Sequence, residues 1–420
     1  MTRTLKEELT AMAVQAREAS QKLSRWTSAQ RAAVLRSMAQ AVKEQSGLIR
    51  EANAQDMIEG KAAGLEKAML DRLELTPARM EALVDGLLQV ADLPDVVGDT
   101  LETINRPNGL TIRKVRVPIG VIGIIYESRP NVTAEAASLC VKSANSVILR
   151  GGKESIHSNR AIVAAMQLGG ERADLPKGAV QLIATTDREA VRVLVQLDGL
   201  VDLVIPRGGE SLIRAVSEMA RVPVIKHYKG VCHTFVDADA DFDMAVAICE
   251  NAKCQRPGVC NAMETLLVHG EAAQQFLPRV ASVLKARGVE LRGDGRSRDI
   301  IPGIKEATDE DWYTEYLDLI LSVRVVKDVQ EAIQHINHYG SHHSDAIVTR
   351  SETNAALFLE SVDSATVYVN ASTRFTDGYE FGMGAEMGIS TDKIHARGPM
   401  GLAELTTYKY VIQGNGQVRP

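Results

Sequence analysis

Apolar residues recur every three or four positions through most of residues 4–96. The pattern is clearest in three stretches: Leu5, Leu9, Met12 and Ala16; Val34, Leu35, Met38 and Val42; and Met80, Leu83, Val84 and Leu87. This spacing puts apolar side chains on one face of a helix. Thr76 followed by Pro77 offers an N-cap and a first helical residue for the third stretch. This part of the chain is therefore predicted to be helical.

The period of the pattern changes near residue 109. Residues 111–117 alternate like a half-exposed strand, and residues 121–125 form a continuous apolar run typical of a buried parallel strand. Further strands are predicted at 146–149, 180–183 and 203–205, and they alternate with helices near 158–168 and 188–196. This order predicts βαβ units and a parallel sheet with helices on both faces.

A second run of the same kind extends from residue 227 to about residue 395. Strands are predicted within it at 234–236, 265–268, 319–326, 346–349 and 366–369. We place a domain boundary at its start. The predicted fold class is therefore α/β, with two parallel-sheet α/β domains.

Composition and charge narrow the class of protein. A chain of 420 residues is long enough for two or three domains, and its net charge of -6 gives no basic footprint for nucleic acid. Apolar runs such as residues 117–126 are shorter than the roughly 20 residues of a membrane span, so no membrane partner is expected. The N-terminus has no apolar export core, and five cysteines show no disulfide pattern. We expect a cytoplasmic protein.

One cysteine stands in a setting suited to chemistry. The segment NAKCQRPGVCNA at residues 251–262 places Cys260 just past a Pro-Gly turn, flanked by Lys253 and Arg256. Nearby cations lower the pKa of a thiol, and the thiolate is the nucleophile. A small buried hydrophobic residue is the alternative for any cysteine, and it is our expectation for Cys140 and Cys249, which lie in apolar helical patterns.

Longer segments carry a family resemblance. The run ETLLVH at 264–269 and the run HYKGVCHTFVDADADF at 227–242 resemble the aldehyde dehydrogenase superfamily. The segments YESRPN at 126–131, KCQRPGVCN at 253–261 and AIQHINHYGSHHSDAI at 332–347 resemble its γ-glutamyl phosphate reductase branch. The resemblance implies an aldehyde dehydrogenase-like fold with a Rossmann-like NADP-binding domain (1–108 and 119–226) and a catalytic domain (227–395). It also implies a small β oligomerisation extension (109–118 and 396–420) and hence a homo-oligomer.

The resemblance also implies an activity. This branch uses NADPH to reduce L-glutamate 5-phosphate to L-glutamate 5-semialdehyde through a cysteine thioester, here on Cys260, in the second step of proline biosynthesis. A glutamate 5-kinase is the implied protein partner. Two alternatives stay open: a CoA-acylating or other semialdehyde dehydrogenase that uses the same cysteine, and a catalytically silent binding protein on this fold.

The cofactor site lacks the usual fingerprints. Neither G-x-G-x-x-G nor G-x-x-x-x-G-K-[ST] occurs in the chain, although the resembled family binds dinucleotide on a five-stranded variant without them. Two glycine pairs, Gly151–Gly152 and Gly208–Gly209, follow predicted strands. Backbone amides and a helix N-terminus at such turns suit a phosphate, although a tight turn by itself needs no ligand.

Three further side chains take their roles from the resemblance. Arg150 and Lys153 flank the turn where the family holds the adenosine ribose, and cations there suit a 2′-phosphate, which favours NADP over NAD. Solvated side chains are the alternative. Glu315 falls where the family keeps a glutamate that binds the nicotinamide ribose.

His227 and Asn131 are the remaining catalytic candidates. His227 occupies the position where hydrolytic relatives carry a glutamate that activates water, so the thioester should resist hydrolysis. It either assists with phosphate or is simply packed. The first oxyanion donor is the Cys260 backbone amide; for the second, Asn131, Ser128 and Arg129 remain open.

The expected substrate carries an acyl phosphate and an amino acid head. Arg129, Arg256 and Arg374 are candidates for the phosphate or the carboxylate, and Glu127 for the amine. Surface ion pairing explains each of them equally well.

A histidine cluster invites a metal hypothesis. His335, His338, His342 and His343 lie close in sequence, but Gly340 ends the helix between them and no cysteine or carboxylate of zinc spacing completes the set. We therefore expect no metal.

Overall fold

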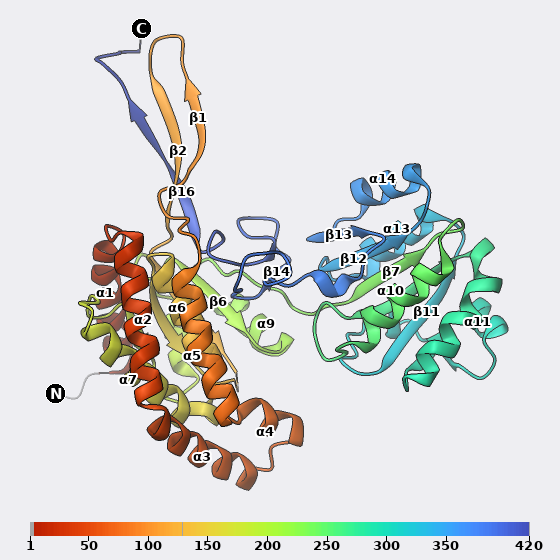
Figure 1. The fold of residues 1–420 in the computed structure, drawn as a ribbon, viewed down its shortest axis with the longest axis horizontal. Helices are drawn as coiled ribbons and strands as arrows, with labels where there is room; N and C mark the ends of the chain where they lie inside the picture. Colours follow the sequence, from red (N-terminus) through yellow and green to blue (C-terminus); the bar gives the residue numbers. More distant parts are fainter. Residues whose placement is uncertain (1–3, 128, 420) are drawn as a thin grey trace. The chain divides into compact units, whose positions relative to one another are not determined.

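The computed structural model describes residues 4–127 and 129–419. Tertiary contacts divide the chain into two compact units (Figure 1). The first comprises Met1–Lys226, Met383–Gly388 and Met400–Pro420, and the second comprises His227–Gly382 and Ile389–Pro399. The chain thus passes into the second unit at His227, returns to the first at Met383–Gly388, and returns to it a second time at Met400 after the second-unit segment Ile389–Pro399.

The first unit begins with helices, as the apolar spacing predicted. They are α1 (Leu5–Leu23), α2 (Ser28–Glu44), α3 (Ser46–Ala62), α4 (Lys67–Leu73) and α5 (Pro77–Asp92). A capping box starts α1, where the Thr4 side chain accepts from the Glu7 amide and Glu7 accepts from the Thr4 amide. At α5, Thr76 is the N-cap and Pro77 the first helical residue, which confirms the prediction.

A parallel sheet of four strands follows, in the order β5-β4-β3-β6. The strands are β3 (Val121–Tyr126), β4 (Ser146–Arg150), β5 (Val180–Leu182) and β6 (Leu203–Arg207). Helices α6 (Asn131–Lys142), α7 (Ile156–Glu171, after the 3-10 turn η1, Lys153–Ser155), α8 (Glu189–Leu194) and α9 (Glu210–Met219) connect them or follow them. One parallel bridge, Val204 to Val224, extends the sheet beyond β6, where the resemblance implied a fifth strand.

Alternate residues of these strands face opposite layers. Val121, Ile125 and Val204 pack in one apolar cluster with α1 and α8, whereas Ile122 and Ile124 of the same strand β3 are equally buried but lie outside that cluster. The continuous apolar runs seen in the sequence are therefore those of a sheet covered on both faces.

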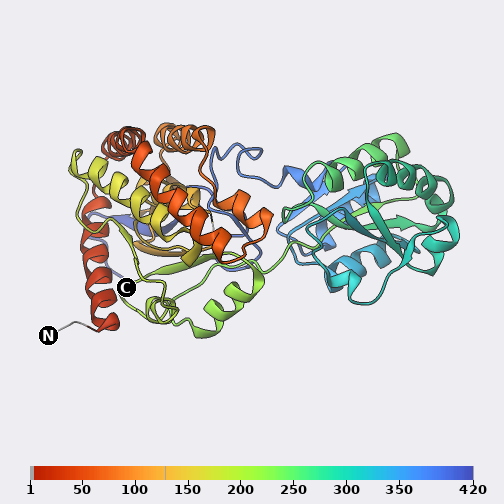
Figure 2. The same ribbon diagram turned by 90° about the horizontal axis from the view of Figure 1, so that it is seen from below.

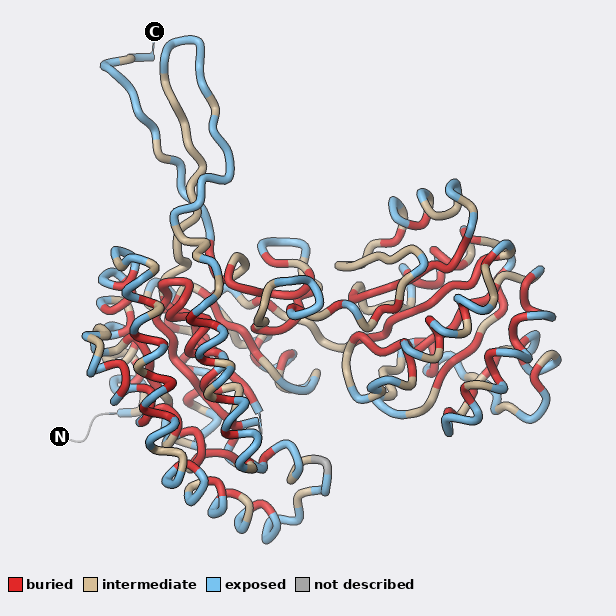
Figure 3. The backbone as a smooth tube through the Cα atoms, in the orientation of Figure 1, coloured by how far each residue is buried: buried red, intermediate tan, exposed pale blue. Residues whose placement is uncertain are grey.

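A separate antiparallel sheet joins distant parts of the chain. It contains β1 (Thr100–Asn105), β2 (Thr111–Pro118) and β16 (Thr406–Gln413), in the order β1-β2-β16. The sequence did not predict β1. Gly109 closes the β1–β2 hairpin with a positive φ of 86°. In Figures 1 and 3 the three strands extend away from the helices of the first unit, and most of their residues are exposed or half-buried.

The second unit is built on seven parallel strands in the order β10-β9-β11-β8-β7-β12-β13. They are β7 (Cys232–Val236), β8 (Met263–His269), β9 (Glu290–Gly293), β10 (Lys305–Glu306), β11 (Ile320–Val326), β12 (Ser344–Val348) and β13 (Thr366–Val369). The five predicted strands are all present, and the short β9 and β10 are additional. A two-stranded pair, β14 (Ile389–Ser390) and β15 (Gly398–Pro399), also belongs to this unit.

Helices cover both faces of the seven-stranded sheet (Figure 2). They are α10 (Phe242–Cys254), α11 (Gly270–Ala286), α12 (Gly295–Ile300), α13 (Val329–Tyr339) and α14 (Glu352–Ser361), with the 3-10 turns η2 (Asp311–Tyr313) and η3 (Thr373–Phe375). On β8, Leu266 packs with α10 and α11 while the adjacent Leu267 packs with α13 and α14. Among the described residues, none of the helices is both long and apolar enough for a bilayer crossing.

Candidate functional site

Cys260 lies on the turn between α10 and β8. Pro257 stands two residues past Gln255, the C-cap of α10, and proline disfavours a further helical turn because it has no amide hydrogen to donate. The turn packs tightly against the segment that leads into β7: a β-carbon on Gly230 would overlap the Cys260 carbonyl oxygen and lie 2.6 Å from its Cα. Cys260 is half-buried. Glycine at position 230 therefore allows the backbone approach that fixes the cysteine.

Two histidines, His227 and His343, lie beside Cys260. His227 precedes β7, Cys260 precedes β8 and His343 directly precedes β12, and these three strands are neighbours in the sheet. The ligand atoms of the three side chains all lie within 4.8 Å of one another. The two imidazole rings are 5.4 Å apart between centroids. The site therefore lies at the amino edge of the sheet.

His343 is held in the neutral form. Its side chain is fully buried, and its Nδ1 lies 2.8 Å from the Ser344 hydroxyl. Burial, and then the nearby His227, lower the pKa of His343 well below its ordinary value. Its Nε2 is buried and has no hydrogen-bond partner. A neutral imidazole nitrogen is thus available beside the cysteine.

A second thiol holds the Cys260 turn through a hydrogen bond. Cys232, at the start of β7, donates from its Sγ to the Cys260 carbonyl oxygen at 3.2 Å. Burial raises the pKa of Cys232 well above its ordinary value, so it stays protonated. Cys140 and Cys249 are also fully buried, and burial raises the pKa of each, which confirms the prediction that they are core residues.

Arg374 ties the two sides of the cysteine turn together. Its Nε donates to Gln255 Oε1 at 2.8 Å, and an Nη donates to Asn261 Oδ1. Burial, followed by repulsion from Arg256, lowers the pKa of Arg374. Arg256 is exposed. The structure thus brings two predicted substrate-binding cations beside Cys260, and one of them also holds the turn.

Lys253 has a different environment from the one its sequence position suggested. Its side chain is fully buried and its Nζ lies 2.5 Å from Glu264 Oε2. Burial raises the pKa of Glu264 to about 7, against the lowering effect of Lys253. The expectation that Lys253 flanks the thiol as a cation is therefore corrected, because Glu264 is buried near the start of a strand and needs a buried cationic partner, which is Lys253.

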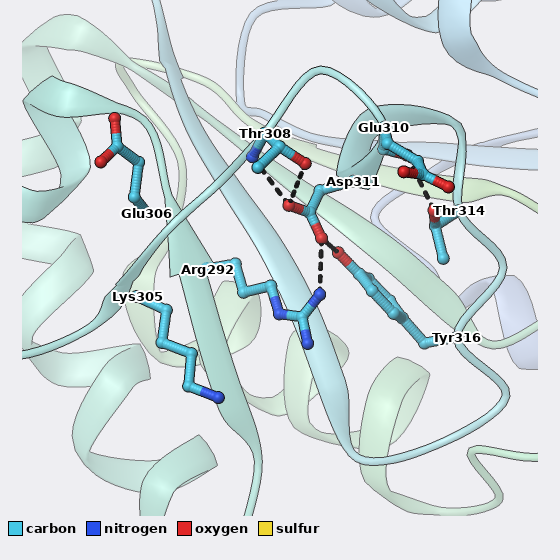
Figure 4. A pocket seen from close by; sticks show the side chains of 8 residues that line it. All are labelled: Arg292, Lys305, Glu306, Thr308, Glu310, Asp311, Thr314 and Tyr316. Atoms are coloured by element: carbon cyan, nitrogen blue, oxygen red, sulfur yellow. Dashed lines mark hydrogen bonds and ion pairs between the residues drawn. The ribbon is translucent and has the colours of Figure 1, made fainter.

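Glu315 stands on the loop that leads into β11, which is the neighbour of β8. Figure 4 shows how this loop is fixed: Asp311 accepts from Arg292 at 2.7 Å, from Tyr316 at 2.6 Å and from the Thr308 amide at 2.7 Å. These residues line a pocket of about 390 Å³. At the other end of the loop, the Leu317 amide donates to Glu264 at 3.3 Å. The glutamate is therefore carried by a rigid segment of the same unit.

In the first unit, Glu127 and the Gly208–Gly209 turn meet. They follow β3 and β6, at the carboxyl ends of two neighbouring parallel strands. This is the switch point of the sheet, because β4 and β5 are added on one side of β3 and β6 on the other. The Gly209 amide donates to Glu127 Oε2 at 2.9 Å. A β-carbon on Gly208 would lie 2.6 Å from the same carboxylate. This turn accordingly binds an anionic oxygen, which a cofactor phosphate also presents.

The neighbouring turn carries Arg150 and Lys153. Arg150 is 9% exposed and donates to the carbonyls of Gly151 at 3.1 Å and Thr186 at 3.2 Å. Its Nε is buried without a partner, and burial lowers its pKa. Lys153 is exposed at the start of η1. A β-carbon on Gly151 would overlap the Asn159 side chain, so this glycine is required by packing.

The oxyanion candidates lie in the same unit as the cofactor turns. Asn131 is the first residue of α6, and its Nδ2 donates to Glu135 Oε1 at 2.7 Å. Arg129 is exposed, and its amide donates to the Glu127 carbonyl at 2.6 Å. Ser128 lies outside the described residues.

The four clustered histidines do not converge. His335 lies 2.9 Å from Arg324, His338 lies 2.9 Å from the Tyr313 hydroxyl, and His342 contacts the Asp363 carbonyl oxygen. Only His343 belongs to the group at Cys260. Strand order, rather than spacing in sequence, therefore decides which histidine reaches the site.

Comparison with known proteins places this geometry in context. The model of the aldehyde dehydrogenase family matches residues 1–310. Gamma-glutamyl phosphate reductase from Caldanaerobacter subterraneus is 55% identical over 98% of this chain and 100% of the relative, and the enzyme of the same name from Moorella thermoacetica is 55% identical over 96% and 97%. The crystal structure of gamma-glutamyl phosphate reductase from Thermotoga maritima has a TM-score of 0.97 at 46% identity, covering 98% of this chain and 100% of that one.

Proposed function

The chain belongs to the aldehyde dehydrogenase family, and from this premise we propose that it reduces L-glutamate 5-phosphate to L-glutamate 5-semialdehyde with release of phosphate, the second step of proline biosynthesis. The observation that carries the proposal is the turn of Cys260. It is fixed by Gly230 and Arg374, and its close neighbours are the imidazoles of His227 and His343. The names of the relatives described above agree with this activity.

Cys260 forms the covalent intermediate. Its thiolate attacks the acyl carbon, the bond from carbon to the phosphate oxygen breaks, and inorganic phosphate leaves with the electron pair. The Cys260 amide donates to the acyl oxygen, and Asn131 is our choice for the second donor. We assign Arg256 and Arg374 to the substrate phosphate, because both lie beside the turn and phosphate attracts guanidinium groups.

His227 handles protons at this edge of the sheet, either by accepting the thiol proton or by donating to the leaving phosphate. It stands where a hydrolytic relative has a carboxylate base, so water is poorly activated against the thioester. Glu127 and Arg129 are our candidates for the amine and the carboxylate of the amino acid head. The small-molecule substrate is thus held by charges of both signs.

The family uses a nicotinamide cofactor, and we propose that it is NADPH, which supplies hydride to the thioester carbon when bound. The residues present fit this group. The Gly209 amide, at the switch point of the sheet, donates to an anionic oxygen of Glu127. A cofactor phosphate would replace that oxygen, which leaves the Glu127 carboxylate to bind the substrate amine. Lys153 is exposed beside the corresponding turn after β4, and Arg150 holds that turn in place through hydrogen bonds to two carbonyls. Glu315 is our candidate for the nicotinamide ribose.

The same proposal extends to partners and location. The exposed faces of β16 carry Tyr408, Tyr410 and Ile412, each about half exposed, and we propose that this sheet pairs with another copy of the chain. The acyl phosphate is reactive toward water, which favours delivery by a glutamate 5-kinase partner. We place the enzyme in the cytoplasm, because all five cysteines are thiols and the nucleophile must stay reduced.

The reverse reaction tests the function directly. Glutamate 5-semialdehyde and NADP are given to the enzyme with phosphate omitted, then with phosphate, and then with CoA in its place. We expect a single burst without phosphate, since acylation of Cys260 consumes one cofactor, and sustained NADPH formation once phosphate is present. Sustained turnover with CoA alone would indicate a CoA-acylating dehydrogenase. Sustained release of glutamate without phosphate would place the chain among hydrolytic enzymes.

A further inference from the structure

The group of His227, Cys260 and His343 has the composition of a metal site as well as that of a nucleophile with two neighbours. We propose that these three side chains form a reversible binding site for a thiophilic divalent cation, with Zn²⁺ the best fit, and that an ion bound there inhibits the enzyme by occupying its nucleophile. The inhibitory part rests on the proposed function of Cys260. The binding part stands on geometry alone.

Three loops supply the ligands. The ligand atoms lie within 4.8 Å of one another, whereas ligands around a tetrahedral zinc at 2.0–2.3 Å are separated by roughly 3.3–3.8 Å. A contraction of about 1 Å therefore completes the site. His227 is a half-buried loop residue and can supply most of that movement, and rotation of the half-buried Cys260 side chain can supply the rest, while the backbone of the Cys260 turn and the fully buried His343 stay fixed. Three protein ligands leave one position open, as in zinc sites that exchange a water.

An independent observation at His343 points to a ligand. Its Nε2 is buried and has no hydrogen-bond partner, and such orphaned buried groups are uncommon because each costs free energy. Its Nδ1 lies 2.8 Å from the Ser344 hydroxyl, which in turn lies 2.6 Å from Thr376 Oγ1. A metal-binding histidine is normally oriented in this way, through a hydrogen bond at the nitrogen that does not bind the ion. A cation would satisfy the Nε2 lone pair.

The chemistry of the donors selects the ion. One thiolate and two neutral imidazoles suit Zn²⁺, whereas Mg²⁺ prefers oxygen ligands. Binding releases the proton of the Cys260 thiol, and no electron is transferred. A thiolate bound to the ion cannot attack an acyl phosphate. A chelator should therefore restore activity rather than remove it.

Binding is measured first without substrate. Purified, chelator-treated full-length protein is titrated with Co²⁺, whose charge-transfer absorption reports a thiolate ligand, and then with Zn²⁺ in competition. We expect one site per chain in the wild-type protein and no charge-transfer band in Cys260→Ser. His227→Gln and His343→Gln should each bind the ion at least about tenfold more weakly, because even the loss of a group that only orients a ligand lowers metal affinity by about 10–100-fold. Cys254→Ser and His335→Gln are the matched controls, because they remove a thiol and a buried imidazole outside the group.

Two outcomes would overturn the proposal: binding that is unchanged in both histidine variants, which would mean that the ion binds the thiol alone, and no thiolate band in the wild-type protein. If circular dichroism shows that His343→Gln does not fold, the test rests on His227→Gln, at a half-buried position. Unchanged binding in that variant would then overturn the proposal. Turnover assays then test inhibition and its reversal by chelator. A Co²⁺ site in a protein that turns over no acyl phosphate would refute the proposed function and leave the site standing, so the two failures are distinguishable.

Discussion

Lys253 Nζ lies 2.5 Å from Glu264 Oε2, and neither side chain is exposed. The pair links the last turn of α10, which leads to Cys260, with the first residues of β8. Glu264 also accepts from the Leu317 amide at 3.3 Å, on the loop that carries Glu315. One buried ion pair thus joins the nucleophile turn to the loop of the candidate ribose-binding residue.

Removing one partner of this pair should destabilise the protein strongly. Lys253→Met or Glu264→Leu leaves a buried group without its charge partner, and we expect a loss of about 3–5 kcal/mol in the free energy of unfolding. The double variant Lys253→Met with Glu264→Leu should recover much of that loss, because no charge stays buried. Urea unfolding of the four proteins measures the coupling. Additive losses in the double variant would show that the two residues act independently.

Cys260→Ala should abolish turnover and leave cofactor binding nearly unchanged, because the covalent step is lost and the residues of the cofactor turns lie in the other unit. Cys254→Ala is the control. Cys254 is the last residue of α10 and burial raises the pKa of its thiol, so we expect it to be dispensable. Steady-state rates and titration of NADPH fluorescence provide the two readouts. Equal losses of activity in both variants would mean that the nucleophile is misassigned.

The strands and helices were predictable wherever the pattern of burial is strong. Val121–Tyr126 is buried at every position, and its apolar run is visible in the sequence. Strand β1 was missed because five of its six residues are exposed and its pattern TLETIN carries no clear alternation. Its place is set by pairing with β2, and sequence periodicity does not report pairing.

Only the parts of the site that have a local sequence signal were predictable. Cys260 is marked by a local Pro-Gly turn, which is visible in the sequence. His343 lies far from it along the chain and reaches it only because β12 is the neighbour of β7 in the sheet. The partner of Lys253 has a signal in the sequence: Glu264 is the second residue of a strand whose first six residues are buried. An acid at such a position needs a cation nearby.

Lys153→Ala should erode the preference for NADPH over NADH. A lost charge-assisted contact to the 2′-phosphate costs about 1.5–3 kcal/mol, which is roughly a ten- to hundredfold change in the ratio of kcat/KM for the two cofactors. Arg150→Ala should reduce the same ratio, and it should also lower thermal stability, because Arg150 donates to the carbonyls of Gly151 and Thr186. An unchanged ratio in both variants would place the phosphate elsewhere.

Acid should destabilise the second unit through His335. Burial, and then His233 and Arg324, lower the pKa of His335 to about 2, so the native chain keeps this imidazole neutral. In the unfolded chain it takes up a proton as the pH falls below about 6.5. Stability therefore falls between about pH 6.5 and pH 2, by up to about 1.4 kcal/mol per pH unit for one proton.

His335→Gln should make that pH dependence shallower without removing it, because the buried His343 acts in the same direction. His338→Gln, at an exposed position on the same helix, is the control for loss of an imidazole. Urea midpoints measured from pH 8 to pH 4 provide the slopes. Identical slopes in the wild-type protein and His335→Gln would contradict the assignment of a neutral buried histidine.

Arg374 should act on the reactivity of Cys260 as well as on substrate binding. Because it donates to both Gln255 and Asn261, Arg374→Gln should let the turn shift, and a displacement of about 1 Å can cost on the order of a hundredfold in rate. We expect a lower kcat and slower alkylation of Cys260 by iodoacetamide in the absence of substrate. Arg256→Gln, at the exposed neighbouring cation, should mainly raise KM. If Arg374→Gln changes KM alone and leaves alkylation at the wild-type rate, its role is confined to the substrate, and Gly230 with the Cys232 hydrogen bond is sufficient to hold the turn.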